Sequence, residues 1–96
     1  MIIYFMLKKS DNMKFDYTIT DELGIHARPA GLLVEETKKF ESKITISLKD
    51  NTVDASSIMK IMMLQAKQND TVTIEATGPD EEEAIEALKE FMKVNF

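Results

Sequence analysis

Residues 44–53, ITISLKDNTV, carry the clearest structural signal in the chain. From Ile44 to Leu48 apolar and polar residues alternate, which is typical of a strand with one buried face. The polar run 49–51 then turns the chain into Thr52-Val53, so the stretch predicts a β-hairpin. Because only one face of such a hairpin is apolar, it favours an antiparallel sheet that is covered on one side.

The same alternation returns at residues 15–19 and 72–76, and it predicts two more strands. Between and after the strands, apolar residues recur every three or four positions, which predicts helices over 27–40, 58–64 and 84–92. The predicted order is therefore βαββαβα. We expect an α+β open-faced β-sandwich, in which a four-stranded antiparallel sheet carries three helices on one face.

The composition excludes several classes of function. The chain has 96 residues, enough for one domain, and its 12 basic and 17 acidic residues give a net charge of −5. An acidic chain without a basic stripe is a poor partner for nucleic acid. The absence of cysteine excludes disulfides, thiolate metal sites and thiol nucleophiles, and a single histidine excludes any site that needs two imidazoles.

The N-terminal residues form a separate unit in the sequence. Residues 1–7, MIIYFML, are far fewer than the ~20 needed to span a bilayer and lack the basic start of a secretory signal. We therefore expect a cytoplasmic protein without membrane insertion. Residues 8–12 are polar, so residues 1–12 are predicted to be an extension on a domain over 13–96. An apolar arm tends to pack on its own domain or on a neighbouring copy.

The most unusual stretch is 23–31, LGIHARPAG. Proline is tolerated in the first turn of a helix, so Pro29 places His26 at or just before a helix start. Free backbone N–H groups and the positive end of the helix dipole favour a phosphate there, and they disfavour imidazolium. A neutral ring nitrogen is then available as a nucleophile, while Arg28 offers a planar guanidinium for phosphate oxygens.

A structural role for these residues is the alternative. A lone histidine near a helix start is usually a cap or a surface residue, and a lone arginine is usually a solvated charge. The combination of His26 and Arg28 with Gly24 and Pro29 favours a functional site. A small α+β interaction domain with a structural His26 stays open as the competing interpretation.

Three segments together resemble the HPr family, the histidine-containing phosphocarriers of the bacterial sugar phosphotransferase system. Residues 24–30, GIHARPA, resemble its phosphorylation-site signature, and 57–62, SIMKIM, its regulatory-site region. Residues 77–81, TGPDE, resemble the entry into its last helix. The resemblance extends from about Lys14 to Met92 and implies an open-faced sandwich of the same element order.

The resemblance implies a carrier with a transient phosphohistidine, which is not an enzyme. His26 would accept a phosphoryl group on Nδ1 from phosphorylated enzyme I and pass it to a histidine of an enzyme IIA component. Arg28 would compensate the charge, and no metal or cofactor is implied. The chain departs from the family at Leu23, where members often carry Ser, Asn or Thr beside the histidine.

Ser57 is the regulatory site that the resemblance implies. It aligns with the serine that HPr kinase/phosphorylase modifies in many Gram-positive relatives, where a catabolite-control regulator is a further partner. Ser56 is a competing acceptor, and Lys60 replaces the glycine that is usual in that branch. Either serine is also a suitable cap for the helix that follows.

The second predicted helix is rich in methionine. Met59, Met62 and Met63 exceed what one short helix buries on a single stripe, and thioethers suit a surface that docks several partners. In the family this helix lies beside the active histidine and contacts enzyme I. We expect Met59 and Met62 to face partners, with Ile58 and Ile61 in or near the core.

A regulatory HPr-like protein that acts mainly by binding other proteins is the second function that stays open. Relatives of that kind can lack the histidine, so the presence of His26 favours the phosphocarrier. The sequence predicts no particular sugar, since that choice lies in the enzyme II proteins, and it does not separate the sugar branch from a nitrogen-regulatory one.

Overall fold

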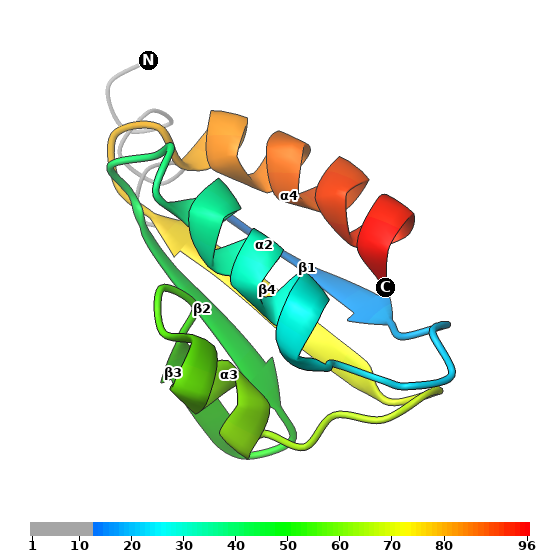
Figure 1. The fold of residues 1–96 in the computed structure, drawn as a ribbon. Coiled ribbons are helices and arrows are strands. Elements are labelled where there is room, and N and C mark those ends of the chain that lie inside the picture. Colours follow the sequence, from blue (N-terminus) through cyan, green and yellow to red (C-terminus); the bar gives the residue numbers. More distant parts are fainter. Residues whose placement is uncertain (1–12) are drawn as a thin grey trace.

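The computed structural model describes residues 13–96 of the chain, and the expected extension over 1–12 lies outside the described residues. The elements follow the predicted βαββαβα order (Figure 1). In chain order they are β1 (Met13–Thr18), α2 (Ala27–Thr37), β2 (Lys43–Leu48), β3 (Asn51–Asp54), α3 (Ile58–Met63), β4 (Thr71–Thr77) and α4 (Glu81–Asn95).

The strands form one antiparallel sheet in the order β1-β4-β2-β3. The predicted hairpin is confirmed, because β2 pairs with β3 and Leu48 lies opposite Asn51. Lys49 takes a positive φ of 55° in the tight turn between them. In the centre of the sheet, Ile74 of β4 lies opposite both Phe15 of β1 and Ile46 of β2, which places the apolar side chains of three strands on one face.

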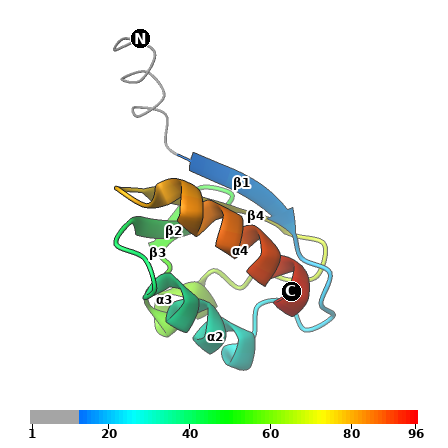
Figure 2. The ribbon, with the colours of Figure 1, turned by 90° about the horizontal axis from the view of Figure 1, so that it is seen from above.

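All three helices lie on that apolar face, and the opposite face of the sheet is open (Figures 1 and 2). The predicted apolar stripe of the last helix is confirmed, with Ala84, Ile85, Leu88 and Met92 all buried. On the sheet side, burial alternates along β4. The fold class expected from the sequence is therefore the observed one.

The helix predicted over 27–40 is shorter in the structure. Regular α-helix ends at Thr37, whose hydroxyl donates to the carbonyl of Val34, and the chain then makes tight turns through Phe40. Phe40 is half-buried and packs against the core, so it continues the apolar spacing after the helix itself has ended.

Asp80 ties the start of α4 to the start of β2. Its carboxylate accepts hydrogen bonds from the backbone N–H groups of Glu41 and Ser42, each at 2.9 Å, and from the Ser42 hydroxyl. The Ser42 hydroxyl, followed by the Glu41 N–H, lowers the pKa of Asp80 below its ordinary value of 3.8. The Asp80 side chain therefore links α4 to β2 and makes no capping hydrogen bond to α4 itself.

Candidate functional site

The loop between β1 and α2 leads directly to His26, and Gly24 fixes its path. Gly24 has a φ of +68°, and a Cβ at this position would lie 2.4 Å from the carbonyl oxygen of Ala66. The next residue, Ile25, is buried and donates its N–H to that same oxygen at 3.0 Å. Only glycine fits such a close approach of two backbones, so this loop is held against the loop between α3 and β4.

His26 is the N-cap residue of α2, as the position of Pro29 predicted. Its backbone is extended (φ −113°), and its carbonyl accepts the first helical hydrogen bond from Ala30 at 3.0 Å. Its side chain makes no capping hydrogen bond and is 35% exposed. The imidazole is thus anchored through its backbone while the ring remains accessible.

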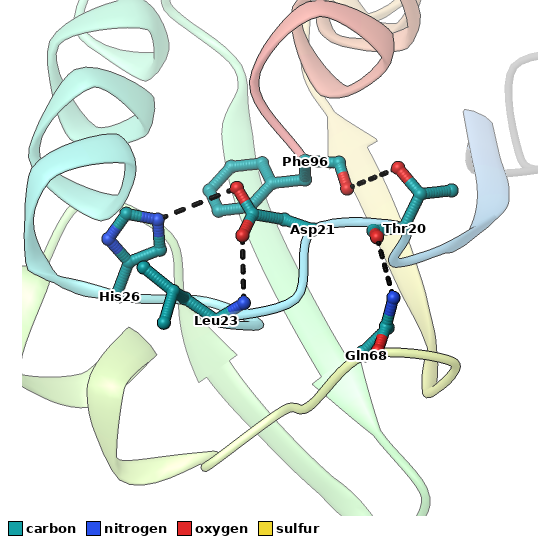
Figure 3. A network of polar contacts seen from close by, with 6 residues as sticks. All are labelled: Thr20, Asp21, Leu23, His26, Gln68 and Phe96. Carbon is teal, nitrogen blue, oxygen red and sulfur yellow. Dashed lines mark hydrogen bonds and ion pairs between the residues drawn. The ribbon is translucent and has the colours of Figure 1, made fainter.

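Asp21 faces the ring from the preceding loop. Its Oδ2 lies 3.6 Å from Nε2 of His26, and its Oδ1 accepts the backbone N–H of Leu23 at 2.8 Å (Figure 3). The other ring nitrogen, Nδ1, points away from this carboxylate (Figure 3). This contact was not predicted from the sequence. The sequence offers one signal for Asp21. An aspartate in a loop can accept the backbone N–H of the residue two positions later, which is Leu23 here.

The segment carrying Asp21 is itself tied to distant parts of the chain. The backbone oxygen of Phe96 accepts the N–H of Thr20 at 2.7 Å, the N–H of Asp21 at 2.8 Å and the Thr20 hydroxyl at 2.9 Å. On the other side, the Gln68 side-chain amide donates to the Thr20 carbonyl at 3.1 Å (Figure 3). The position of Asp21 is therefore set by the end of α4 and by the loop before β4.

The first turn of α2 supplies donors for an anion. Because Pro29 lacks an N–H, the backbone donors left over there are those of Ala27 and Arg28. The Arg28 side chain is exposed, and it makes no ion pair with any residue in 13–96. Backbone donors, an exposed guanidinium and an accessible imidazole therefore occur within three consecutive residues.

Helix α3 lies beside α2. A Cβ added to Gly31 of α2 would be 3.7 Å from Cδ1 of Ile58, which puts the two helices in side-chain contact. Met59 is 75% exposed, and Ile61 is fully buried as expected. The expectation for Ile58 was wrong, because its side chain is 45% exposed.

Two further apolar side chains change the expected surface. Met62 is half-buried and packs against the core, whereas Met63, which was not expected at the surface, is 72% exposed. Leu23, in the loop before His26, is also 72% exposed. We call Leu23, Ile58, Met59 and Met63 the apolar surface.

Ser57 is the N-cap of α3, and its hydroxyl accepts the backbone N–H of Lys60 at 3.3 Å. Ser56 is engaged differently, because its hydroxyl donates to Asp54 at 2.6 Å. The Ser56 hydroxyl and then the Ser56 N–H lower the pKa of Asp54 below its ordinary value of 3.8. Of the two serines that the sequence offered as caps, the structure assigns this position to Ser57.

The described residues contain neither a cluster of metal ligands nor a membrane-spanning helix. Over 13–96, no three His, Cys, Asp or Glu side chains are grouped so that they could hold a metal ion. In the same part of the chain, no helix has both the length and the apolar character needed to cross a membrane.

Comparison with known proteins identifies the family. A family model described as the PTS HPr component phosphorylation site matches residues 13–94. Phosphocarrier protein HPr of Mycoplasma capricolum subsp. capricolum is 43% identical over 79 residues, which cover 82% of this chain and 89% of that protein. The solved structure of a mycoplasma histidine-containing phosphocarrier protein is 42% identical with a TM-score of 0.81, over 83% of this chain and 91% of that one.

A regulatory relative has the same fold. The structure of the Bacillus subtilis catabolite repression protein Crh, described as a swapped dimer, is 34% identical with a TM-score of 0.70. The match covers 82% of this chain and 91% of Crh. Since the family model spans nearly all of the described residues and several HPr proteins are similar over most of their length, the chain belongs to the HPr family of phosphocarriers of the phosphotransferase system.

Proposed function

We propose that the chain carries a phosphoryl group on Nδ1 of His26, which it accepts from phosphorylated enzyme I and passes to a histidine of an enzyme IIA component. The observation that supports this most is the placement of His26. Its ring stands at the start of α2, is partly exposed and makes no capping bond. Family membership supplies the class of reaction, since HPr proteins are phosphocarriers.

The chemistry follows from the groups around the ring. Nδ1 attacks the phosphorus atom, and covalent attachment divides the transfer between two partner proteins. The N–H groups of Ala27 and Arg28, together with the positive end of the α2 dipole, favour the phosphoryl oxygens at this position. The guanidinium of Arg28 adds charge-assisted hydrogen bonds. A phosphocarrier must also release the phosphoryl group. A few exposed hydrogen-bond donors are therefore more suitable than a closed site that binds phosphate tightly.

The apolar surface is the docking site in this proposal. It consists of Leu23 in the loop before His26 and of three residues of α3, of which Met59 and Met63 are the most exposed. Methionine adapts to unrelated surfaces, which suits a protein that binds enzyme I and several IIA components in turn. Met62 is half-buried against the core on the same helix, and we include it in the proposed docking site next to the apolar surface. The domain over 13–96 carries the function, in the cytoplasm, and residues 1–12 are dispensable for it.

The test is phosphorylation by purified enzyme I and phosphoenolpyruvate, followed by intact mass measurement at neutral pH. We expect an acid-labile gain of one phosphoryl group in the wild type and none in His26→Ala. Circular dichroism of the variant should show a normal fold, since His26 is not part of the buried core. Labelling of His26→Ala, or no labelling of the wild type, would contradict the proposal.

Regulation at Ser57 is a second proposal, supported by the resemblance of residues 57–62 to the family's regulatory region and by the likeness to Crh. A phosphate on Ser57 would lie beside the apolar surface, where its negative charge opposes the docking of enzyme I. The measurement is acid-stable phosphate after incubation with HPr kinase/phosphorylase and ATP. Ser57→Ala should remove it and Ser56→Ala should not; equal labelling of wild type and Ser57→Ala would place the site elsewhere.

A further inference from the structure

The His26 ring has two chemically different sides. Nε2 faces the carboxylate of Asp21 at 3.6 Å, whereas Nδ1 points away from it (Figure 3). A separation of 3.6 Å is longer than a hydrogen bond but short enough for a strong electrostatic effect. A carboxylate beside one nitrogen of a neutral imidazole favours the tautomer with its proton on that nitrogen, because N–H then points its positive end at the negative charge.

We propose that Asp21 is a positioning residue for His26: it holds the ring proton on Nε2 and so leaves the lone pair of Nδ1 free for phosphoryl transfer. The inference rests on the proposed function for the transfer itself. The effect on the tautomer depends only on the geometry of Asp21 and His26.

Asp21 is held in place before any phosphate arrives. Its Oδ1 is occupied by the Leu23 N–H at 2.8 Å, which leaves Oδ2 toward the ring. Its own N–H is bound by the Phe96 oxygen at 2.8 Å, so the backbone of the residue is fixed as well. Such a carboxylate does not need to reorient during the reaction, and this is the property that makes an electrostatic contribution effective. The exposed Leu23 side chain has no polar group that could interact with the His26 ring in this way.

The same arrangement suits the product. The lone pair of Nδ1 forms the new N–P bond while the N–P bond of the donor phosphohistidine breaks. The donor ring, protonated on its other nitrogen, leaves as neutral imidazole. His26 keeps its proton on Nε2, so its phosphorylated ring carries a positive charge that faces Asp21. The carboxylate thus favours both the reactive tautomer and the charged product ring.

The size of the effect is bounded by exposure. The side chains of His26 and Asp21 are 35% and 33% exposed, so solvent screens the interaction. We expect the ratio of the Nε2–H to the Nδ1–H tautomer to fall by about two- to fivefold when the charge is removed, as for other partly exposed ion pairs. The rate of phosphoryl transfer to His26 should fall by a similar factor.

The experiment compares Asp21→Asn with Asp16→Asn in full-length protein. Asparagine at 21 keeps an oxygen for the Leu23 N–H and removes only the charge. Asp16 is exposed on β1 and accepts the Thr73 hydroxyl, so its variant is the matched control for loss of one negative charge. The ring-nitrogen shifts of ¹⁵N-labelled protein report the tautomer ratio at alkaline pH, where imidazole is neutral, and rapid quench with phosphorylated enzyme I reports the rate.

The inference predicts a lower tautomer ratio and a slower transfer in Asp21→Asn, with both quantities unchanged in Asp16→Asn. An unchanged ratio overturns it, even if transfer slows, because Asp21 would then act on docking or folding. A lower ratio with an unchanged rate also overturns it, because the tautomer would not limit the reaction. Failure of the wild type to accept phosphate would refute the proposed function instead, and the shifts would still show whether Asp21 controls the ring.

Discussion

At the level of single residues, His26 and Arg28 have different roles in the proposed site. In the proposed function His26 supplies the nucleophile, and the structure leaves its ring accessible at the start of α2. Arg28 is exposed on the same turn and has no competing ion pair with the described part of the chain. Such an exposed guanidinium can meet the phosphoryl group without breaking an ion pair with residues 13–96.

Replacing Arg28 by alanine should therefore slow phosphoryl transfer without abolishing it. Loss of a charge-assisted hydrogen bond to the phosphoryl oxygens corresponds to a rate reduction of about tenfold. Rapid-quench transfer from phosphorylated enzyme I measures it. Lys38→Ala removes a cation at the far end of α2 and should leave the rate unchanged. Complete loss of transfer in Arg28→Ala would mean that this residue does more than compensate charge.

At the level of elements, the loops matter as much as the helices and strands. The segment before His26 lies against residues 66–68, and Gly24 is the point of closest approach. Asp80 makes a comparable link between α4 and the start of β2. Both links join segments that are far apart in the sequence.

Gly24→Ala should destabilise the fold. A left-handed backbone costs a non-glycine residue about 1–2 kcal/mol, and forcing a methyl group against the Ala66 backbone adds about 1–3 kcal/mol. Urea unfolding should thus show a loss of roughly 2–5 kcal/mol in the free energy of unfolding. Gly31→Ala is the control, because its Cβ would make an ordinary 3.7 Å contact with Ile58 and alanine favours helix. Equal stability of Gly24→Ala and wild type would contradict the close approach.

Asp80 should make stability fall in acid. Its pKa is lowered in the folded state, chiefly by the Ser42 hydroxyl, so the unfolded chain binds this proton more readily. The contribution is complete above the ordinary value of 3.8 and is lost as the pH falls through the folded pKa. Below about pH 4, the free energy of unfolding should thus depend less on pH in Asp80→Asn than in wild type. Ser42→Ala should weaken the dependence in the same direction, and an unchanged slope in both variants would exclude this role.

The elements could be predicted from the sequence because burial on one face imposes a visible period. Ile44 to Leu48 show period two, and Ala84 to Met92 show the helical spacing. Helix α3 has only six residues, and almost every position is apolar, so the spacing could not separate Ile58 from Met62. The contact of Asp21 with His26 could not be predicted for another reason. The hydrogen bonds that place this segment come from Phe96 and from the loop before β4, which are far away in the sequence.

At the level of the whole molecule, the site is assembled on one end of the helical layer. The loop that carries Asp21, the start of α2 and the exposed part of α3 come from three separate stretches of chain. The sheet provides the common base under them, with its other face open (Figure 2). All residues of the proposed site therefore come from the described part of the chain, residues 13–96.

Deleting residues 1–12 should leave phosphorylation of His26 unimpaired, because β1 begins at Met13 with its pairing to β4. The rate of transfer from enzyme I and the midpoint of thermal unfolding should match those of the full chain. A truncated protein that folds but does not accept phosphate would show that the extension takes part in the reaction.

The hydrogen bonds from Thr20 and Asp21 to the Phe96 oxygen have a consequence for hydrogen exchange. The amide protons of Thr20 and Asp21 can exchange with solvent only when their hydrogen bonds to that oxygen break. Phe96 in turn is held by its N–H to Met92 and by the tilted packing of its ring on Phe91. Opening of the loop before His26 and fraying of the final turn of α4 are thus one cooperative event. The amides of Thr20, Asp21 and Phe96 should lose their protection together, so the opening of the loop before His26 is coupled to the last turn of α4.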